Sequence, residues 1–267
     1  MLTLAGSLAV GAVMALPSQH SGRLVKVYGD LATADRVAIV VPGADTTVAT
    51  FEASTKRPGG AARALLAEAA KVGHGERLAV IAWLGYDAPP TWSLGAITDA
   101  AAVEGAKALR RTVTELHART SAPIALLCHS YGSVVCAEAG PDLPVADMAL
   151  FGSPGLGTPS DHAPSDPSDL TPSDLTPSDP TRSDRSLSAT RVWAGVGGSD
   201  WIRFVPKMKL GPLGFGADAL SPGYGARVFE VGPGGHSDYF APGTPSLRNL
   251  TFIALGRPGD VVAAAPA

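Results

Sequence analysis

The sequence predicts an α/β fold in which a mostly parallel, doubly wound sheet is flanked by helices. Short runs rich in Val, Ile and Ala alternate with alanine-rich segments of helical length, a pattern typical of parallel strands joined by right-handed crossovers. A sharp strand-to-helix junction occurs at Ser130. Further along the chain, Asp200 and His236 each follow a later predicted strand. These three observations together point to the α/β-hydrolase arrangement.

The apolar runs predict strands at 24–28, 36–41, 78–83, 123–128, 145–151, 190–196 and 227–231. Residues 24–28 alternate in polarity, which is typical of an edge strand, whereas the longer continuous runs predict buried strands. Helical spacing of apolar residues predicts helices at 60–72, 99–117, 134–139 and 245–255. Gly and Pro are frequent between residues 206 and 226, which predicts a long loop.

A chain of 267 residues suits one α/β domain, which we place at 23–256. Residues 157–188 interrupt it with repeats of Ser-Asp-Leu-Thr-Pro, a low-complexity insertion that has almost nothing to bury. Residues 257–267 are expected to form a flexible C-terminal tail.

The N-terminal segment 1–22 is apolar between residues 2 and 16. This stretch is shorter than the roughly 20 residues of a spanning helix, and it lacks the basic lead-in of a signal peptide. A signal or anchor and a helix packed on the domain both remain open. The protein is exported or membrane-associated in the first case and cytoplasmic in the second.

Composition excludes several function classes. A formal net charge of −3 provides no basic face for nucleic acid. No His, Cys, Asp and Glu cluster has metal-ligand spacing, and no phosphate loop occurs, so we expect neither a metal nor a cofactor. Cys128 stands at a strand end and Cys136 nearly two turns into the next helix, so both are expected to be free thiols.

The segment around Ser130 has the form of a nucleophile elbow. A strand ends at Cys128, Ser130 stands at the turn, and small Gly132 follows before a helix begins. This turn exposes the serine hydroxyl at the sheet edge, and small residues two before and two after it let strand and helix pass closely. Here Cys128 replaces the first small residue. The alternative is an ordinary helix with Ser130 as its N-cap.

A nucleophilic serine needs a base and an orienting acid, which follow it in the order Asp, then His, in this fold. Asp200 and His236 follow late strands, so their side chains are expected at the same sheet edge as Ser130. Asp161 is an alternative acid within the insertion. Asp200 can also be explained as a helix N-cap, and His236 as a turn residue.

Loops at the same edge supply the remaining candidates. The backbone N–H groups of Tyr131 and of the 43–45 loop, Ala44 in particular, are expected to form the oxyanion hole. Aromatic residues in two other loops, Tyr86 and Trp92 in one and Trp201 in the next, are candidate substrate-binding residues, because loops at the carboxyl ends of strands carry the sites of open α/β sheets.

Four motifs extend beyond single residues: Trp83-Leu-Gly-Tyr-Asp-Ala-Pro89, His129-Ser-Tyr-Gly-Ser133, Gly152-Ser-Pro-Gly155 and His236-Ser-Asp-Tyr-Phe240. Together they resemble an actinobacterial family of α/β-hydrolase domains of unknown function, over about residues 37–256. The family pattern reads G-H-S-Y-G-S where this chain has C-H-S-Y-G-S. The resemblance implies a hydrolase fold and a Ser-Asp-His site, but it implies no substrate.

The sequence therefore predicts a serine hydrolase that cleaves a small-molecule or lipid carboxylic ester through an acyl-enzyme. Acyl transfer is a related alternative. A non-catalytic binding or cell-envelope module is the alternative from another class, because Cys128 could distort the elbow.

Overall fold

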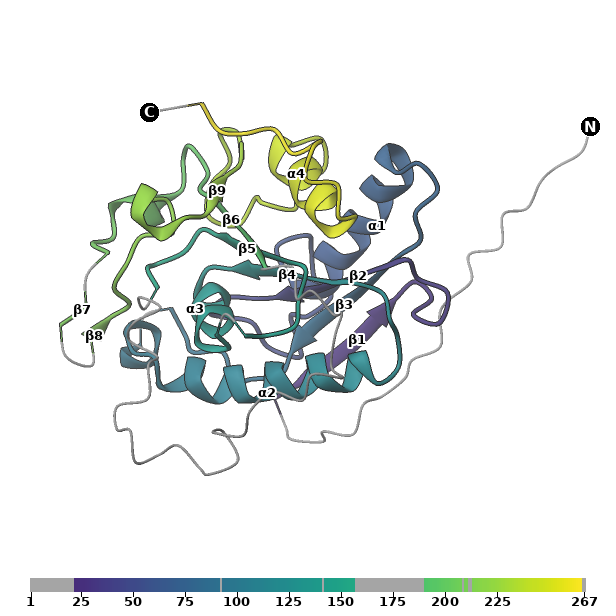
Figure 1. The fold of residues 1–267 in the computed structure, drawn as a ribbon. Helices are drawn as coiled ribbons and strands as arrows, with labels where there is room; N and C mark the ends of the chain where they lie inside the picture. Colours follow the sequence, from purple (N-terminus) through teal and green to yellow (C-terminus); the bar gives the residue numbers. More distant parts are fainter. Residues whose placement is uncertain are drawn as a thin grey trace, which may run out of the picture.

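The computed structural model describes residues 22–91, 93–140, 142–156, 190–207, 209–210 and 213–265. A seven-stranded sheet in the order β1-β3-β2-β4-β5-β6-β9 forms its centre (Figure 1). Only β1 is antiparallel to its neighbour within this sheet. The strands are β1 (Leu24–Tyr28), β2 (Arg36–Val41), β3 (Leu78–Leu84), β4 (Ile124–His129), β5 (Asp147–Phe151), β6 (Arg191–Gly195) and β9 (Arg227–Val228).

Helices cover both faces of the sheet, as a doubly wound fold requires. On one face lie α1 (Pro58–Val72) and α4 (Pro245–Ala254), and on the other lie α2 (Ala100–His117) and α3 (Tyr131–Glu138) (Figure 1). Short 3-10 turns η1 (Leu94–Ile97), η5 (Trp201–Phe204) and η6 (Pro222–Tyr224) occur in the connections, with a small ribbon of β7 (Lys209–Leu210) and β8 (Leu213–Gly214). The predicted fold class is confirmed.

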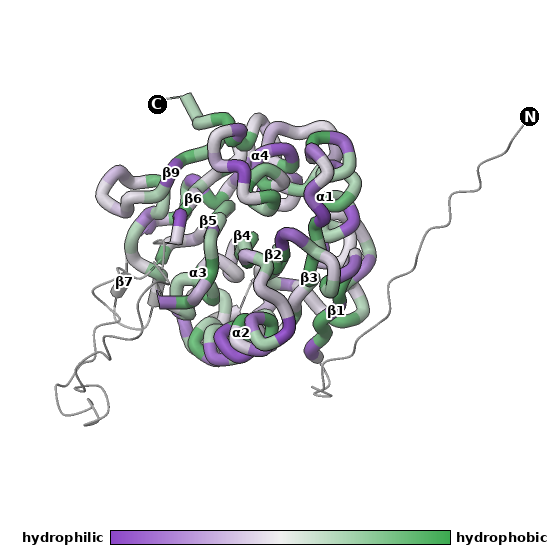
Figure 2. The backbone as a smooth tube through the Cα atoms, turned by 45° about the vertical axis from the view of Figure 1, so that its right-hand side comes forward, coloured by the Kyte–Doolittle hydropathy of each residue, from purple (hydrophilic) through white to green (hydrophobic). Residues whose placement is uncertain are grey.

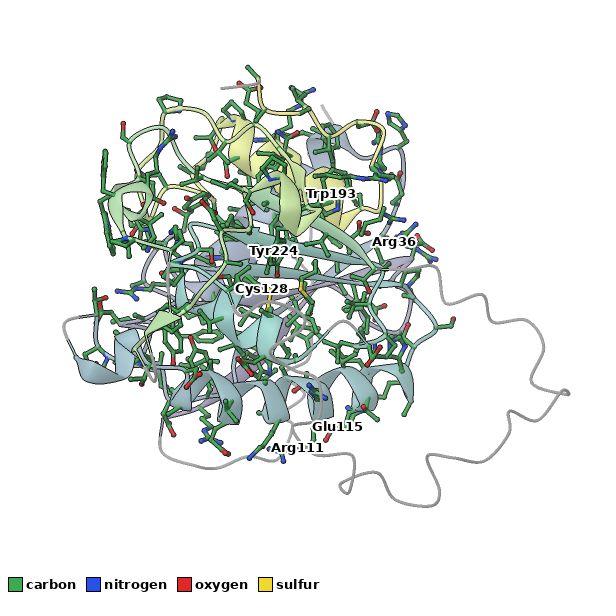
Figure 3. All side chains as sticks on the ribbon, turned by 60° about the vertical axis from the view of Figure 1, so that its left-hand side comes forward. Arg36, Arg111, Glu115, Cys128, Trp193 and Tyr224 are labelled. Atoms are coloured by element: carbon green, nitrogen blue, oxygen red, sulfur yellow. A yellow bond between two sulfur atoms is a disulfide. The ribbon has the colours of Figure 1, made fainter. Side chains whose placement is uncertain are left out.

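Alternation along the strands divides the core into two apolar clusters. In β2, Ile39 faces the cluster under α2 and α3, whereas Val40 faces the cluster under α1 and α4. The outer side of α2 is polar, and its colours alternate in Figure 2. Arg111 and Glu115 point away from the sheet on this helix (Figure 3). These two clusters make the sheet a rigid support for the loops at its carboxyl edge.

Every predicted strand and helix appears, with ends that differ by a few residues. Helix α1 begins at Pro58, because proline suits the first helical turn, where its missing N–H has no helical partner to lose. The region predicted as one long loop at 206–226 instead contains β7, β8 and η6.

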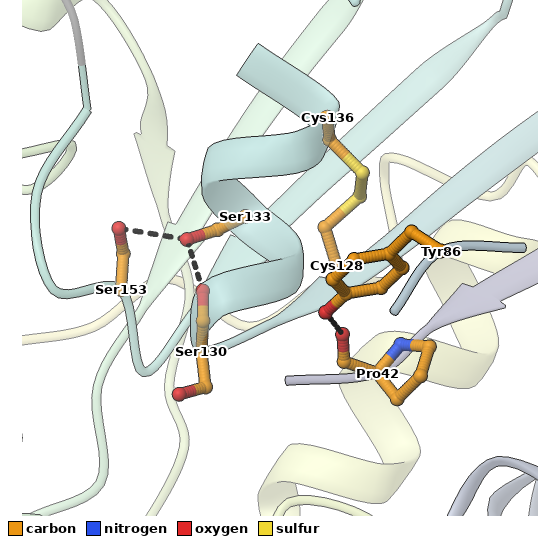
Figure 4. The surroundings of a disulfide bond; sticks show 7 residues. All are labelled: Pro42, Tyr86, Cys128, Ser130, Ser133, Cys136 and Ser153. Carbon is orange, nitrogen blue, oxygen red and sulfur yellow. Dashed lines mark hydrogen bonds between the residues drawn. A yellow bond between two sulfur atoms is a disulfide. The ribbon is translucent and has the colours of Figure 1, made fainter. Parts of the chain in front are cut away.

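The prediction that Cys128 and Cys136 are free thiols is wrong. They form a disulfide, with Cα atoms 6.5 Å apart (Figures 3 and 4). The elbow turns the chain back sharply, so that α3 lies beside β4 and the two side chains meet in the core. The prediction from sequence spacing placed the two cysteines too far apart, because it did not include the tight turn that brings α3 back beside β4.

Residues 257–265 differ from the flexible tail that the sequence predicts. Ala263 forms a β-bridge with Phe229, and the Val262 N–H donates to Asn249 Oδ1 at 2.9 Å. The insertion and the apolar N-terminal segment, residues 157–189 and 1–21, lie outside the described residues. Within the described part of the chain, no helix combines the length and apolarity needed to cross a membrane.

Candidate active site

Ser130 occupies the turn between β4 and α3 with φ 54° and ψ −125°. A non-glycine residue rarely adopts positive φ, because its Cβ meets the backbone, so neighbouring structure must hold the turn. Two glycines leave the space that this turn needs. A Cβ on Gly132 would lie 2.5 Å from the Pro42 carbonyl oxygen, and one on Gly43 would lie 2.6 Å from Ser130 Cβ. The geometry is that of a nucleophile elbow.

Three side chains from separate loops meet at this turn. His236, which follows β9, places Nε2 2.8 Å from Ser130 Oγ. Its Nδ1 lies 2.9 Å from Asp200 Oδ1 and 3.1 Å from Oδ2. Asp200 follows β6, and its side chain is fully buried, whereas His236 keeps 15% exposure. The structure thus brings together the three residues that the sequence singled out.

Two donors besides His236 form hydrogen bonds with the Asp200 carboxylate. Its Oδ1 accepts from the Ile202 N–H at 2.9 Å, and its Oδ2 accepts from the Tyr239 hydroxyl at 2.5 Å. Burial by itself raises the pKa of this carboxyl, but the hydrogen bonds from His236, Tyr239 and Ile202 outweigh it and lower the pKa below its usual value. Asp200 therefore caps η5, as the alternative interpretation held, and also contacts the histidine.

Tyr239 is a site residue that sequence reasoning missed. Its ring is buried, and its hydroxyl accepts from the Gly197 N–H at 3.2 Å while donating to Asp200. The signal was its place in the motif that begins at His236. Asp238, from the same motif, accepts from the Gly235 N–H at 3.0 Å and shapes the histidine loop. Asp161 lies outside the described residues.

Tyr131 follows Ser130 directly, and Gly43, the residue before Ala44, packs against the Ser130 side chain. Tyr131 is the first residue of α3, so its N–H has no intrahelical acceptor. Within the described part of the chain, neither this N–H nor that of Ala44 has a hydrogen-bond acceptor. Asp45 pins the loop after Ala44: its Oδ1 accepts from the Thr91 N–H at 3.0 Å, and its own N–H donates to the Pro89 carbonyl at 3.1 Å.

Tyr86 does not wall a pocket as the sequence suggested. Its side chain is 1% exposed, and its hydroxyl donates to the Pro42 carbonyl oxygen at 2.7 Å (Figure 4). A buried tyrosine ring packs in the core, but its hydroxyl needs a hydrogen-bond partner. Here the backbone of the 42–45 loop supplies that partner. Tyr86 therefore anchors the 42–45 loop from below.

The other two aromatic candidates have different outcomes. Trp92 lies outside the described residues. Trp201 is 48% exposed, and its ring centroid lies 4.7 Å from that of His236. It stands at the rim of the site, where its indole screens one side of the imidazole from water.

Cys128 occupies the position where elbows usually carry a small residue. Its side chain is fully buried, and the disulfide directs it toward Cys136 on α3 (Figure 4). The Cys128 sulfur therefore leaves the crowded turn and enters the core. Helix and strand still pass closely, because Gly132 faces Pro42 on the other side of the turn.

No group of three or more His, Cys, Asp and Glu side chains that could hold a metal ion occurs among the described residues. The chemistry available at the site is that of a hydroxyl beside an imidazole, an imidazole beside a buried carboxylate, and two N–H groups.

The sheet order, the elbow and the positions of the three side chains define the α/β-hydrolase class of proteins. The sequence pattern of the family described as alpha/beta hydrolase matches residues 17–165. The chain belongs to this alpha/beta hydrolase family.

Relatives in Mycobacterium tuberculosis are uncharacterized. One is 35% identical over 134 residues, covering 48% of this chain and 50% of the relative. Another is 28% identical over 272 residues, covering 91% of this chain and 38% of the relative. The chain thus spans half or less of the length of these curated relatives.

Similar solved structures are more distant in sequence. The crystal structure of esterase PE8 is 16% identical, with a TM-score of 0.45, over 86% of this chain and 96% of that one. A putative non-heme bromoperoxidase from Mycobacterium tuberculosis is 14% identical, with a TM-score of 0.45, over 88% and 95%.

Proposed function

We propose that this protein is a serine hydrolase that cleaves carboxylic esters, with Ser130 as nucleophile, His236 as general base and Asp200 as its orienting acid. One observation carries the proposal: an unbroken chain of hydrogen bonds runs from buried Asp200 through His236 to a serine at positive φ. A structural serine cap needs neither a buried carboxylate nor a strained backbone.

In the proposed reaction, His236 Nε2 takes the hydroxyl proton while Ser130 Oγ attacks the ester carbonyl. The same imidazolium then donates that proton to the leaving alcohol as the carbonyl re-forms. Asp200 fixes the tautomer that carries hydrogen on Nδ1, and it stabilises the imidazolium. Because the hydrogen bonds from His236, Tyr239 and Ile202 outweigh the effect of burial and lower the pKa, Asp200 stays ionised and acts as a fixed negative charge.

The negative oxygen of the tetrahedral intermediate would be bound by the N–H groups of Tyr131 and Ala44. Preorganisation of these donors is supported by the rigid loop that Tyr86 and Thr91 hold in place. Removing one donor of an oxyanion hole typically costs about 10²–10³ in rate. Water then attacks the acyl-enzyme, with His236 again as base, and releases the acid.

A fluorophosphonate probe tests the assignment. We expect it to label the wild-type protein and the Ser221→Ala variant, which removes an exposed loop hydroxyl, but not Ser130→Ala. His236→Ala should slow labelling and abolish ester turnover while leaving the melting temperature nearly unchanged. Labelling that persists in folded Ser130→Ala, or a folded wild type that never reacts, would contradict the proposal.

A further inference from the structure

The carboxyl edge of the sheet also contains a charged cavity. A cavity of about 180 Å³ lies where β5 and β6 end. We call it the Arg203–Lys207 cavity. Its lining combines apolar side chains with two cations and one carboxylate: Leu150, Ser153, Gly195, Val196, Arg203, Lys207, Asp218, Ala219 and Leu220.

Short hydrogen bonds connect this cavity to the nucleophile. Ser153 in its wall accepts from Ser133 Oγ, with the two oxygens 2.8 Å apart, and Ser133 Oγ also lies 2.6 Å from the Ser130 carbonyl oxygen (Figure 4). The residue before Ser153 approaches the acid, because a Cβ on Gly152 would lie 3.2 Å from Asp200 Oδ2. The cavity wall is therefore linked to the Ser130 backbone through Ser133, and it lies beside Asp200.

The ammonium group of Lys207 is fixed in the cavity wall. It donates to the Ser153 carbonyl at 2.5 Å and to the Ile202 carbonyl at 3.1 Å. An ammonium has three donors, so one remains for another acceptor. Burial lowers the pKa of Lys207, partly offset by the negative charges of Asp218 and Asp200, so a further anion beside the ammonium group would be favoured.

The charges of the lining residues do not cancel. In the described part of the chain, neither Arg203 nor Lys207 forms a salt bridge. Asp218 turns its Oδ1 to the Leu220 N–H at 3.0 Å, so one carboxylate oxygen is engaged with its own loop. The lining residues themselves carry two cations and one carboxylate, and the charge of Asp200 acts on Lys207 from behind the wall.

We propose that the Arg203–Lys207 cavity binds the far end of the acyl chain, and that the preferred substrates are esters whose acyl chain ends in a carboxylate. This inference rests on the proposed function. Apolar Leu150, Val196 and Leu220 suit the methylene groups, and the two cations suit the terminal anion. At about 30 Å³ for each non-hydrogen atom, the cavity holds roughly six such atoms. A short dicarboxylic monoester fits, whereas a long fatty acyl chain does not.

A purely structural role for Lys207 is the competing explanation, since its two carbonyl bonds tie η5 to the loop after β5. The two roles separate experimentally. A structural lysine changes the rates with all esters together, whereas a binding lysine changes the ratio between charged and neutral esters.

The test compares monoethyl succinate with ethyl butanoate, which share the alcohol and differ in the end of the acyl chain. We expect wild-type kcat/KM to be higher for monoethyl succinate. The ratio of the two values should fall about tenfold or more in Lys207→Met and in Arg203→Gln, as expected for losing a hydrogen bond to a charged group. Arg248→Gln, which removes an exposed cation on α4, should leave the ratio unchanged.

Equal ratios in all four proteins, or a wild-type preference for ethyl butanoate, would overturn the inference while leaving the serine hydrolase intact. Arg203 is exposed, so Arg203→Gln gives an answer even if Lys207→Met fails to fold. If no ester is cleaved, calorimetric measurement of ester binding to Ser130→Ala still tests the inference. Monoethyl succinate should bind more tightly than ethyl butanoate, and the added Arg203→Gln change should remove the difference. Equal binding of the two esters to Ser130→Ala would overturn the inference.

Discussion

His129 Nε2 lies 2.7 Å from the backbone carbonyl oxygen of His236. A carbonyl only accepts, so His129 carries its hydrogen on Nε2 and donates it. The variable residue of the elbow therefore holds the backbone of His236. The His129 ring also packs against Phe151 and Tyr239, with centroids 5.6 and 5.3 Å away. Ser130 and His236 are thus positioned by neighbouring parts of one network.

Replacing His129 should impair turnover without touching the reacting atoms. In His129→Phe the ring packing is retained, but the donor to the His236 carbonyl is lost. We expect kcat to fall about tenfold, because a small displacement of the base costs much of its alignment, while KM changes little. Steady-state kinetics on a neutral ester measures this.

The matched control is His117→Phe, which deletes a similar bond from an imidazole to a backbone carbonyl, that of Pro144, far from the site. Equal losses in both variants would mean that His129 acts only through stability. His129→Gln, which keeps a donor, should recover part of the activity.

His129 also makes the fold sensitive to acid. Burial, aided by the charge of His236, lowers the pKa of His129 to about 3 from an ordinary 6.5. The unfolded chain binds a proton below pH 6.5, whereas the folded chain does so only near pH 3. The stability that neutral His129 contributes is complete above 6.5 and is lost as pH falls toward 3.

At pH 5 the loss is about 1–2 kcal/mol. Urea unfolding at pH 7 and pH 5 measures it, with His129→Phe as the variant in which this part of the pH dependence should vanish. An identical fall in stability in wild type and variant would show that other groups cause it.

Tyr239→Phe removes one donor from Asp200 Oδ2. Without that hydrogen bond, fewer interactions counteract the effect of burial, so the pKa of Asp200 should rise. We expect a lower kcat at neutral pH and an acid limb of the kcat profile that moves to higher pH. A pH–rate profile from pH 4 to 9 checks both.

Tyr28→Phe serves as its control, since Tyr28 also donates to a carboxylate, that of Glu52, but does so at the sheet edge on β1. A Tyr239→Phe profile that superimposes on the wild type would show that Asp200 does not depend on this phenol.

The disulfide should stabilise the elbow rather than drive the chemistry. Closing a loop of this size lowers the entropy of the unfolded chain by an amount worth about 2.5 kcal/mol, so Cys128→Ala with Cys136→Ala should lower Tm by about 5–10 °C. Ester turnover at 25 °C should persist, because the side chains point into the core. Calorimetric scans and initial rates measure these effects, and scans with and without a thiol reductant should reproduce the shift in the wild type only. Loss of turnover in a folded double variant would mean that the bridge sets the oxyanion geometry.

Local sequence patterns were enough to predict the order of strands and helices, the elbow at Ser130 and the sheet edge that carries Asp200 and His236. Each depends on short-range periodicity, turn residues or the rule that parallel strands end at one edge. What required the tertiary structure were side-chain contacts between different elements of the fold. Tyr86 supports the Pro42 carbonyl, Tyr239 supports Asp200, and Cys128 meets Cys136, which no periodicity encodes. At Ser130, the residue types specify a turn, but its positive φ is held by close packing against Gly43 and the β2 end.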